Sequence, residues 1–277
     1  MHSQFGSTSA YWLANKATDE FYHGTESLLA YFWESCWEEL TKCMIAPQQR
    51  TALHVYLQYL HDFTLNFSTL KFDRETVFEM HFRILNDAKI PFSMSYPDFK
   101  AVEECASCGS CRACRHLKEY EETVAHHLEQ AMRTIEHAAF HLLVHNKTFL
   151  NDFNMYLAEK LQDNLPRLGD LYPEDFTEVL KLRTPKFWPL WLERALVYRE
   201  QGRCAVCGRD VSGIMNLKSK YVVGYLVPLS ANGNNDPTNL QVLCLHCGRE
   251  QSERLRQSNW RKRLFAGFSG GPHKTLK

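Results

Sequence analysis

Apolar residues recur at three- and four-residue steps through most of the first 190 residues of the chain. One stripe contains Leu29, Trp33, Leu40 and Met44, and a longer one extends from Leu117 to Leu142. Residues at this spacing lie on one face of an α-helix and pack against neighbouring helices. We therefore expect helices over about 29–44, 53–60, 77–85 and 117–147. Together they predict a mainly α fold with a helical bundle as its body.

The pattern changes after Pro185. A short helix is predicted over 191–201, ending at Gly202, and the aromatic and β-branched residues of 221–227 predict a strand. A Gly/Asn-rich loop follows over 230–237, and another helix is expected to begin near Arg249. This division predicts a helical domain over 1–190, a second domain over 191–260 and a basic tail over 261–277.

Two Cys-x-x-Cys pairs give the second domain its clearest chemistry. Cys204 and Cys207 form the first pair, and Cys244 and Cys247 form the second. Each pair places two thiolates on one tight turn, and two such turns supply the four ligands of a tetrahedral zinc ion. We expect this zinc to be structural.

A second group of cysteines lies in the helical domain. Its members follow one another at three-residue steps, with a histidine close behind: Cys105, Cys108, Cys111, Cys114 and His116. With these four, eight of the ten cysteines of the chain have Cys-x-x-Cys spacing. In a chain without secretory features, such spacing favours metal ligands over disulfides.

Three interpretations of the 105–114 cysteines are open. The first is a second zinc site held by Cys105, Cys108, Cys111 and Cys114, with His116 as a further candidate ligand. Turns so close together would strain to surround one ion, so replacement of one of the four by a remote ligand such as Cys36, Cys43 or a histidine is left open. The second is an iron–sulfur cluster, although the Cys-x₃-Cys-Pro ending of ferredoxin sequences is missing. The third is a set of free or redox-active thiols. We favour zinc.

The net charge of zero conceals an uneven distribution of charge. Residues 201–277 contain 12 Lys plus Arg but 4 Asp plus Glu, so the first 200 residues carry the compensating acidic excess. A basic module favours contact with a polyanion such as DNA or RNA. The residues that we expect to make that contact are Arg203, Arg209, Lys218, Lys220, Arg249 and Arg254.

The segment from 194 to 255 resembles the HNH endonuclease family. The resemblance is carried by 194–208 around the first cysteine pair, by 226–230 (Leu-Val-Pro-Leu-Ser) and by 239–244 (Asn-Leu-Gln-Val-Leu-Cys). It covers roughly a fifth of the chain. It implies a ββα-metal (treble-clef) fold in which the structural zinc joins the two cysteine turns.

The resemblance also implies catalytic residues that this chain lacks. In the family an Asp-His pair precedes the apolar-Pro-Leu segment; the Asp helps to bind a divalent ion and the His acts as general base. Here those positions hold Gly224 and Tyr225, and the position after the last cysteine, where the family has His or Asn, holds Gly248. Asn239, which resembles the central Asn of the family, is retained. These replacements predict a degenerate nuclease site.

An alternative keeps the protein an enzyme. A rearranged site built from Tyr225, Asn239, Asp236 and His246 would make it a metal-dependent HNH-type endonuclease that hydrolyses phosphodiesters, with Mg²⁺ as cofactor. A second alternative is a structural adaptor whose zinc module binds protein.

We expect a zinc-binding HNH-like protein that binds nucleic acid or acts as a scaffold subunit, without nuclease activity. A protein partner or self-association is expected through the helical domain, and the resemblance suggests a part in a bacterial anti-phage system. Since 1–4 lack the features of a signal peptide and no apolar run reaches roughly 18 residues, we expect a cytoplasmic protein without membrane contact.

Overall fold

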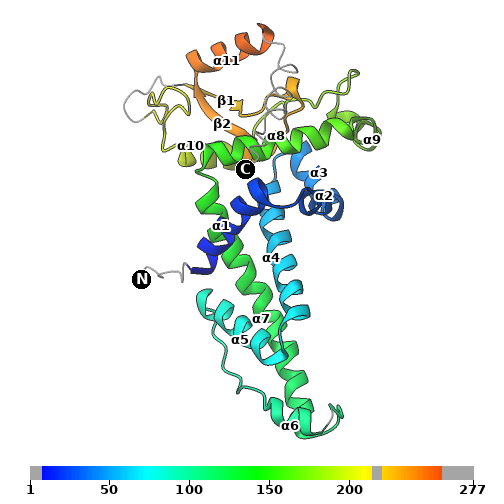
Figure 1. Cartoon of the computed structure of the whole chain (residues 1–277). Coiled ribbons are helices and arrows are strands. Elements are labelled where there is room, and N and C mark those ends of the chain that lie inside the picture. Colours follow the sequence, from blue (N-terminus) through cyan, green and yellow to red (C-terminus); the bar gives the residue numbers. More distant parts are fainter. Residues whose placement is uncertain (1–7, 106, 214–219, 258–277) are drawn as a thin grey trace, which may run out of the picture. The chain divides into compact units, whose positions relative to one another are not determined.

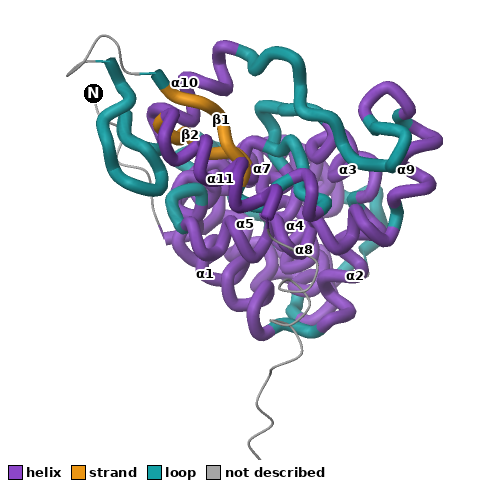
Figure 2. Tube along the Cα trace, turned by 90° about the horizontal axis from the view of Figure 1, so that it is seen from above, coloured by secondary structure: helices purple, strands orange, loops and turns teal. Residues whose placement is uncertain are grey.

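The computed structural model describes residues 8–105, 107–213 and 220–257 (Figure 1). Its helices are α1 (Thr8–His23), α2 (Glu26–Ser35), α3 (Trp37–Ile45), α4 (Ala52–Lys71), α5 (Arg74–Asp87), α6 (Phe99–Glu104), α7 (Arg112–Leu143), α8 (Lys147–Asp163), α9 (Leu165–Leu171), α10 (Leu190–Arg199) and α11 (Leu245–Gln257). Its strands are β1 (Tyr221–Tyr225) and β2 (Leu240–Cys244). The mainly α fold class with a small C-terminal ββ-α module is confirmed, and Figure 2 shows how far helix predominates.

The described residues divide into two compact units. Unit 1 draws on Met1–Cys36 and Leu53–Leu143, and unit 2 on Trp37–Ala52 and Val144–Lys277. Unit 2 therefore contains α3, α8 and α9 beside the C-terminal module. The domain boundary near residue 190 stays a prediction, and the basic tail at 261–277 lies outside the described residues.

The regular secondary structure of unit 1, in its described residues, is all α-helix. The predicted stripe of α7 is buried at Leu117, Val124, Leu128, Ile135 and Ala139, whereas its last member, Leu142, is exposed. In the same unit α1, α2 and α4 meet around one ring. The Tyr56 hydroxyl donates to the Ala17 carbonyl at 3.1 Å, and the Tyr56 ring packs 5.0 Å from that of Phe32.

Two predicted helix boundaries were wrong for local reasons. The 29–44 stripe is divided between α2 and α3, because the backbone of Cys36 is not helical. Cys36 is the C-cap of α2, and its N–H donates to the Phe32 carbonyl. The long helix ends at Leu143 rather than 147. Asn146 begins α8 instead, since its side chain accepts the Phe149 N–H at 3.1 Å as an N-cap.

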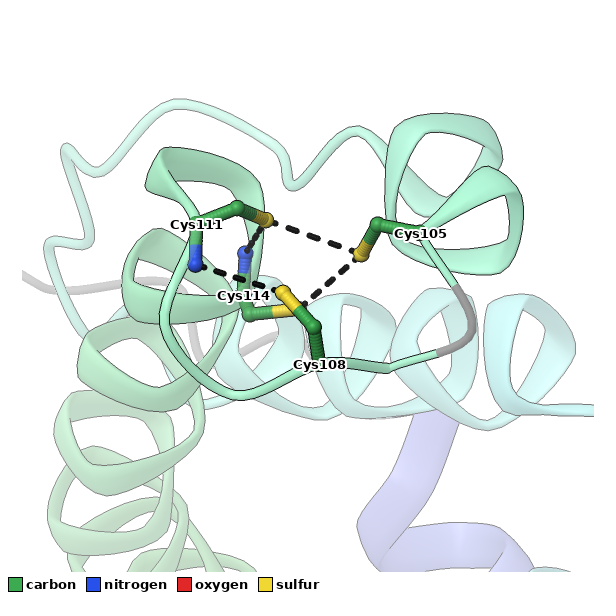
Figure 3. A group of neighbouring side chains, drawn as sticks. All are labelled: Cys105, Cys108, Cys111 and Cys114. Carbon is green, nitrogen blue, oxygen red and sulfur yellow. Dashed lines mark hydrogen bonds between the residues drawn. The ribbon is translucent and has the colours of Figure 1, made fainter.

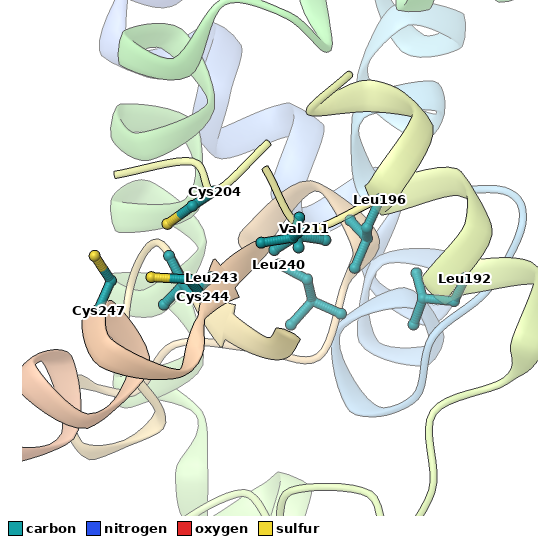
Figure 4. Close-up of a cluster of buried hydrophobic side chains, with 9 residues drawn as sticks. Leu192, Leu196, Cys204, Val211, Leu240, Leu243, Cys244 and Cys247 are labelled. Carbon is teal, nitrogen blue, oxygen red and sulfur yellow. The ribbon is translucent and has the colours of Figure 1, made fainter. Parts of the chain in front are cut away.

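Unit 2 contains a two-stranded antiparallel sheet, in which Tyr221 pairs with Cys244 and Tyr225 with Leu240. The sheet is small, so α10 and α11 complete its core. Figure 4 shows that Leu192 and Leu196 of α10 point into the same buried cluster as Val211 and Leu240. The last helix begins at Leu245 rather than near Arg249, which places Cys247 on its first turn.

The Gly/Asn-rich loop between the strands is buried. Asn235 donates its backbone N–H to the Met44 carbonyl and its side-chain amide to the Ile45 carbonyl, each at 2.8 Å. Asp236, fully buried, accepts the Ala52 N–H at 2.7 Å, the Thr238 N–H at 2.8 Å and the Thr238 hydroxyl at 2.6 Å. These bonds join the C-terminal module to α3 and explain why 37–52 belong to unit 2.

None of the helices within the described ranges is long and apolar enough to cross a membrane.

Replacing Asp236 with Asn should lower the free energy of unfolding by about 2–4 kcal/mol. The amide keeps one acceptor oxygen, so at least one buried donor loses its partner and faces an N–H group. Urea unfolding of Asp236→Asn, compared with Asp170→Asn on the exposed surface of α9, measures the difference. Equal stability of the two variants would contradict this role for the carboxylate.

Candidate metal centres

The cysteines at the start of unit 2's C-terminal module lie on a tight turn. The Cys204 N–H donates to the Arg209 carbonyl at 2.8 Å, and the Gly208 N–H donates to the Cys204 carbonyl at 2.9 Å. Gly208 has φ +70°, a left-handed conformation that glycine adopts without steric cost. The turn therefore presents Cys204 and Cys207 on one side.

The second cysteine pair comes from β2 and α11 and meets the first. The Sγ atoms of Cys204, Cys207, Cys244 and Cys247 all lie within 4.8 Å of one another. Figure 4 shows three of these thiols converging. The Cys207–Cys244 Sγ distance is 3.7 Å. A tetrahedral ion with bonds of about 2.3 Å requires sulfurs about 3.8 Å apart, so this group fits one metal ion.

Backbone N–H groups around Cys204 favour the ionised form of its thiol. Burial opposes its ionisation, but the N–H groups of Cys207, Cys244 and Val206 stabilise the thiolate and lower its pKa to about 6. A thiolate is the form that binds metal.

The 105–114 cysteines also converge (Figure 3). Cys105 ends α6 and Cys114 lies in the first turn of α7, and their Sγ atoms are 3.4 Å apart. The Cys111–Cys105 distance is 3.6 Å and the Cys108–Cys114 distance 4.0 Å. These values bracket the spacing for one tetrahedral ion, so this group also could hold a metal.

The convergence of the four sulfurs requires no remote ligand for this group. Among the described residues the four adjacent cysteines form the group without Cys36 or Cys43. The Cys43 thiol instead donates to the Arg50 carbonyl, and His116 is half-buried, with Nε2 3.2 Å from the Ser95 hydroxyl. The four can converge because Ser107 and Gly109 adopt positive φ of 54° and 73°, which reverses the chain between the cysteines.

Backbone N–H groups also point at these sulfurs. The Cys111 N–H donates to Cys108 Sγ and the Cys114 N–H to Cys111 Sγ, both at 3.4 Å. The N–H groups of Ser110 and Cys111 lower the pKa of the Cys108 thiol to about 6. The start of α7 thus contributes donors as well as ligands.

A side chain at the position expected for a catalytic Asp would displace two neighbouring side chains. A Cβ built on Gly224 would lie 2.5 Å from Leu243 Cδ1 and 2.7 Å from Gln251 Oε1. The Gln251 amide donates to the Tyr225 carbonyl at 2.9 Å, which fixes α11 against β1 at this point. At Gly248 a Cβ would lie 2.5 Å from Val222 Cγ2. The two glycines allow α11 to approach β1 closely.

Tyr225 occupies the position of the general base but has the wrong protonation chemistry. Its hydroxyl donates to Asn235 Oδ1 at 3.0 Å, and burial raises its pKa to about 12. A phenol that stays protonated at neutral pH accepts no proton from water.

Asp236 and His246, two other members of the alternative active site, lie in different environments. Asp236 is buried and accepts three hydrogen bonds. Burial raises its pKa to about 6, although hydrogen bonds from Thr238 and Ala52 and the charge of Arg199 act to lower it. His246 is exposed on α11, with Nε2 3.5 Å from Glu250 Oε1. Asp236 therefore supports the loop, while His246 faces solvent.

Asn239 holds the loop that leads away from β1. Its Oδ1 accepts the Val227 N–H at 2.8 Å, and its Nδ2 donates to the Val227 carbonyl at 2.9 Å and the Asn234 carbonyl at 2.8 Å. All of its polar atoms are thus used within the protein.

The structure describes the side chains of four of the six basic residues that are expected to contact nucleic acid. Arg203 and Arg209 flank the first cysteine turn, Lys220 precedes β1 and Arg249 lies on α11, and all four are exposed. Lys218 and the side chain of Arg254 lie outside what the structure describes.

Comparison with known protein families gives one match, and it lies in this module. Residues 204–254 match the model of the HNH endonuclease family. The HNH domain thus includes both cysteine turns, β1, β2 and the first turns of α11. Searches of the curated proteins and of the solved structures found no match.

Sequence reasoning missed Gln251 and Asn235, which contact Tyr225. Gln251 follows Cys247 by four residues, so placing Cys247 on a helix would have aligned Gln251 with the same face. No local pattern indicated Asn235, because its partners lie on α3, about 190 residues away.

Elemental analysis of the purified protein should find two equivalents of zinc per chain and no iron. Cys244→Ser should remove one equivalent and Cys108→Ser the other, because each replaces one of four ligands. Cys43→Ser, at a buried thiol outside both groups, serves as the control and should retain both. A brown protein absorbing near 400 nm, or a single equivalent in the unaltered chain, would contradict this assignment.

Proposed function

We propose that this protein is a zinc-stabilised scaffold whose HNH domain binds nucleic acid without hydrolysing it. The observation that carries the proposal is the close contact of α11 with β1 at Gly224 and Gly248. A side chain at Gly224 would displace the ends of Leu243 and Gln251, and one at Gly248 would displace the end of Val222, so this packing depends on glycine at both positions.

The loss of the catalytic groups is large in kinetic terms. Removing a general base slows a reaction by roughly 10²- to 10⁴-fold. A missing carboxylate ligand weakens the hold on the ion that would stabilise charge on the scissile phosphate. Tyr225 restores neither function, since it is half-buried, hydrogen-bonded and protonated. Both losses support an inactive site.

Zinc is the metal that we propose for both cysteine groups. Their sulfurs lie within 4.8 Å of one another, as four ligands of one ion do. An iron–sulfur cluster would attach its thiolates to separate iron atoms, which holds the sulfurs farther apart. In each group the ion would join two segments and would supply no step of a reaction.

The exposed basic residues of the HNH domain support binding to DNA or RNA. Arg203 and Arg209 lie beside one cysteine turn, and Lys220 and Arg249 extend positive charge to β1 and α11. Cations attract the phosphate backbone whatever its sequence. We therefore propose contact chiefly with phosphates.

A protein partner or self-association is proposed through unit 1. Tyr11, Trp12 and Tyr31 of α1 and α2 are exposed there, and exposed aromatic residues are enriched at protein interfaces. A cytoplasmic location and a role as a subunit in bacterial anti-phage defence belong to the same proposal.

The protein should not cleave plasmid DNA above background with Mg²⁺, Mn²⁺ or Ni²⁺. Agarose-gel assays of supercoiled plasmid measure this directly, with an active HNH nuclease as the positive control. Tyr225→Phe and His246→Ala should leave the result unchanged. Metal-dependent cleavage that disappears in either variant would establish the rearranged endonuclease instead.

Nucleic-acid binding should weaken steeply with salt. The double variant Arg203→Ala/Arg209→Ala should bind more weakly and lower the slope of log K against log salt by about 2, because two phosphate contacts are lost. Fluorescence anisotropy with a labelled 20-base-pair duplex measures both effects.

The control for this experiment is Lys100→Ala/Lys118→Ala, which removes two exposed positive charges from unit 1. It should bind as tightly as the unaltered protein. Absence of salt-sensitive binding would favour the protein-binding adaptor and contradict the proposal.

A further inference from the structure

The outer face of α10 is an exposed surface that the proposed function does not use. We define it by Lys186 and Phe187, which precede the helix, and by Leu190, Arg194 and Tyr198. Phe187 is 88% exposed, Leu190 60% and Tyr198 82%. Large rings with this exposure are uncommon unless they bind something.

The orientation of this face follows from the packing of α10. Leu192 and Leu196 lie in the core cluster of the HNH domain, as Figure 4 shows. Since successive helical residues are 100° apart, positions 190, 194 and 198 lie on the opposite side. The core therefore turns Leu190, Arg194 and Tyr198 toward solvent together.

The charge of the outer face is positive. Lys186 and Arg194 are exposed, and no ion pair involves either of them within the described residues. The acidic neighbours are engaged elsewhere. Glu193 accepts the Tyr221 hydroxyl at 3.2 Å, and Glu200 pairs with Arg199 and Lys147. A polyanion would meet no exposed carboxylate from α10 here.

We propose that the outer face of α10 binds single-stranded nucleic acid, with the rings of Phe187 and Tyr198 stacking on unpaired bases. Lys186 and Arg194 would contact the phosphates between them. The inference rests on the proposed function and narrows its substrate class from nucleic acid in general to strands with unpaired bases.

Geometry favours single strands over a duplex. In a duplex the base faces are stacked on one another, so a ring on a convex helix reaches only the backbone and groove edges. An unpaired base offers its face to an aromatic ring. Leu190 and Tyr198 are separated by two helical turns, about 12 Å, and Phe187 precedes Leu190 in the chain, so the rings of Phe187 and Tyr198 would contact different bases.

The arrangement of charge favours nucleic acid over a protein partner. Protein interfaces are depleted of lysine, although arginine is enriched in them together with aromatic residues, so Lys186 is the residue that argues against a protein partner. Here Arg194 lies between Leu190 and Tyr198, and Lys186 adjoins Phe187, so rings and cations alternate. Such alternation is typical of surfaces that bind single strands. Arg203, five residues after Tyr198, would continue the path toward the first cysteine turn.

The test is fluorescence anisotropy with a labelled 20-nucleotide DNA strand of mixed sequence and with the duplex formed by that strand. Phe187→Ala and Tyr198→Ala should each weaken binding of the single strand by roughly 5- to 100-fold. Duplex binding should change by less than about 2-fold, because its phosphate contacts remain. Tyr198→Trp keeps a stacking ring and should bind like the unaltered protein.

A matched control separates stacking from the loss of any exposed apolar side chain. Val179 is exposed in the same unit, so Val179→Ala should leave both affinities unchanged. Unaltered single-strand binding in Phe187→Ala/Tyr198→Ala, with binding weakened by Arg203→Ala/Arg209→Ala, would overturn this inference and leave the proposed function standing. No binding of either probe by the unaltered protein would overturn both.

Self-association is the remaining outcome. Sedimentation velocity that shows a dimer of the unaltered protein, lost in Tyr198→Ala, would assign the outer face to protein contact and also overturn the inference.

Discussion

The meeting of four thiolates from two distant turns is the interaction on which the HNH domain depends. Cys204 and Cys207 precede β1, whereas Cys244 and Cys247 follow β2, so an ion held between them joins the beginning and end of the module. Two five-residue strands bury too little to be stable alone. Metal binding can supply the missing free energy of folding. The 105–114 cysteines apply the same solution to α6 and α7 in unit 1.

In our proposal, the cysteines that stabilise the module are distinct from the residues at the expected catalytic site, which explains how the fold can persist without catalytic groups. The thiolates maintain the shape of the module, and residues at the site of hydrolysis can change without unfolding it. Gly224 and Gly248 do more than remove functional groups, because they let α11 lie close to β1. Gln251 then bonds to the Tyr225 carbonyl, and Tyr225 to Asn235. In our proposal the former site becomes part of the packing.

Local patterns predicted those features that depend on local constraints. The stripe of α7 is buried as expected, and the four cysteines of the HNH domain meet as their spacing predicted. Other features were missed or left open because distant or backbone effects determine them. A loop was predicted at 230–237, but nothing in its pattern indicated burial, because the hydrogen-bond partners of Asn235 lie on α3. The 105–114 cysteines converge without a remote ligand because Ser107 and Gly109 reverse the chain.

The most direct test of the account is anomalous X-ray scattering from crystals soaked in Mn²⁺, recorded at the zinc and manganese edges. The account predicts zinc at both four-cysteine groups and no manganese beside Gly224 and Tyr225. A hydrated manganese ion bound at that point of β1, in reach of a phosphodiester, would contradict it.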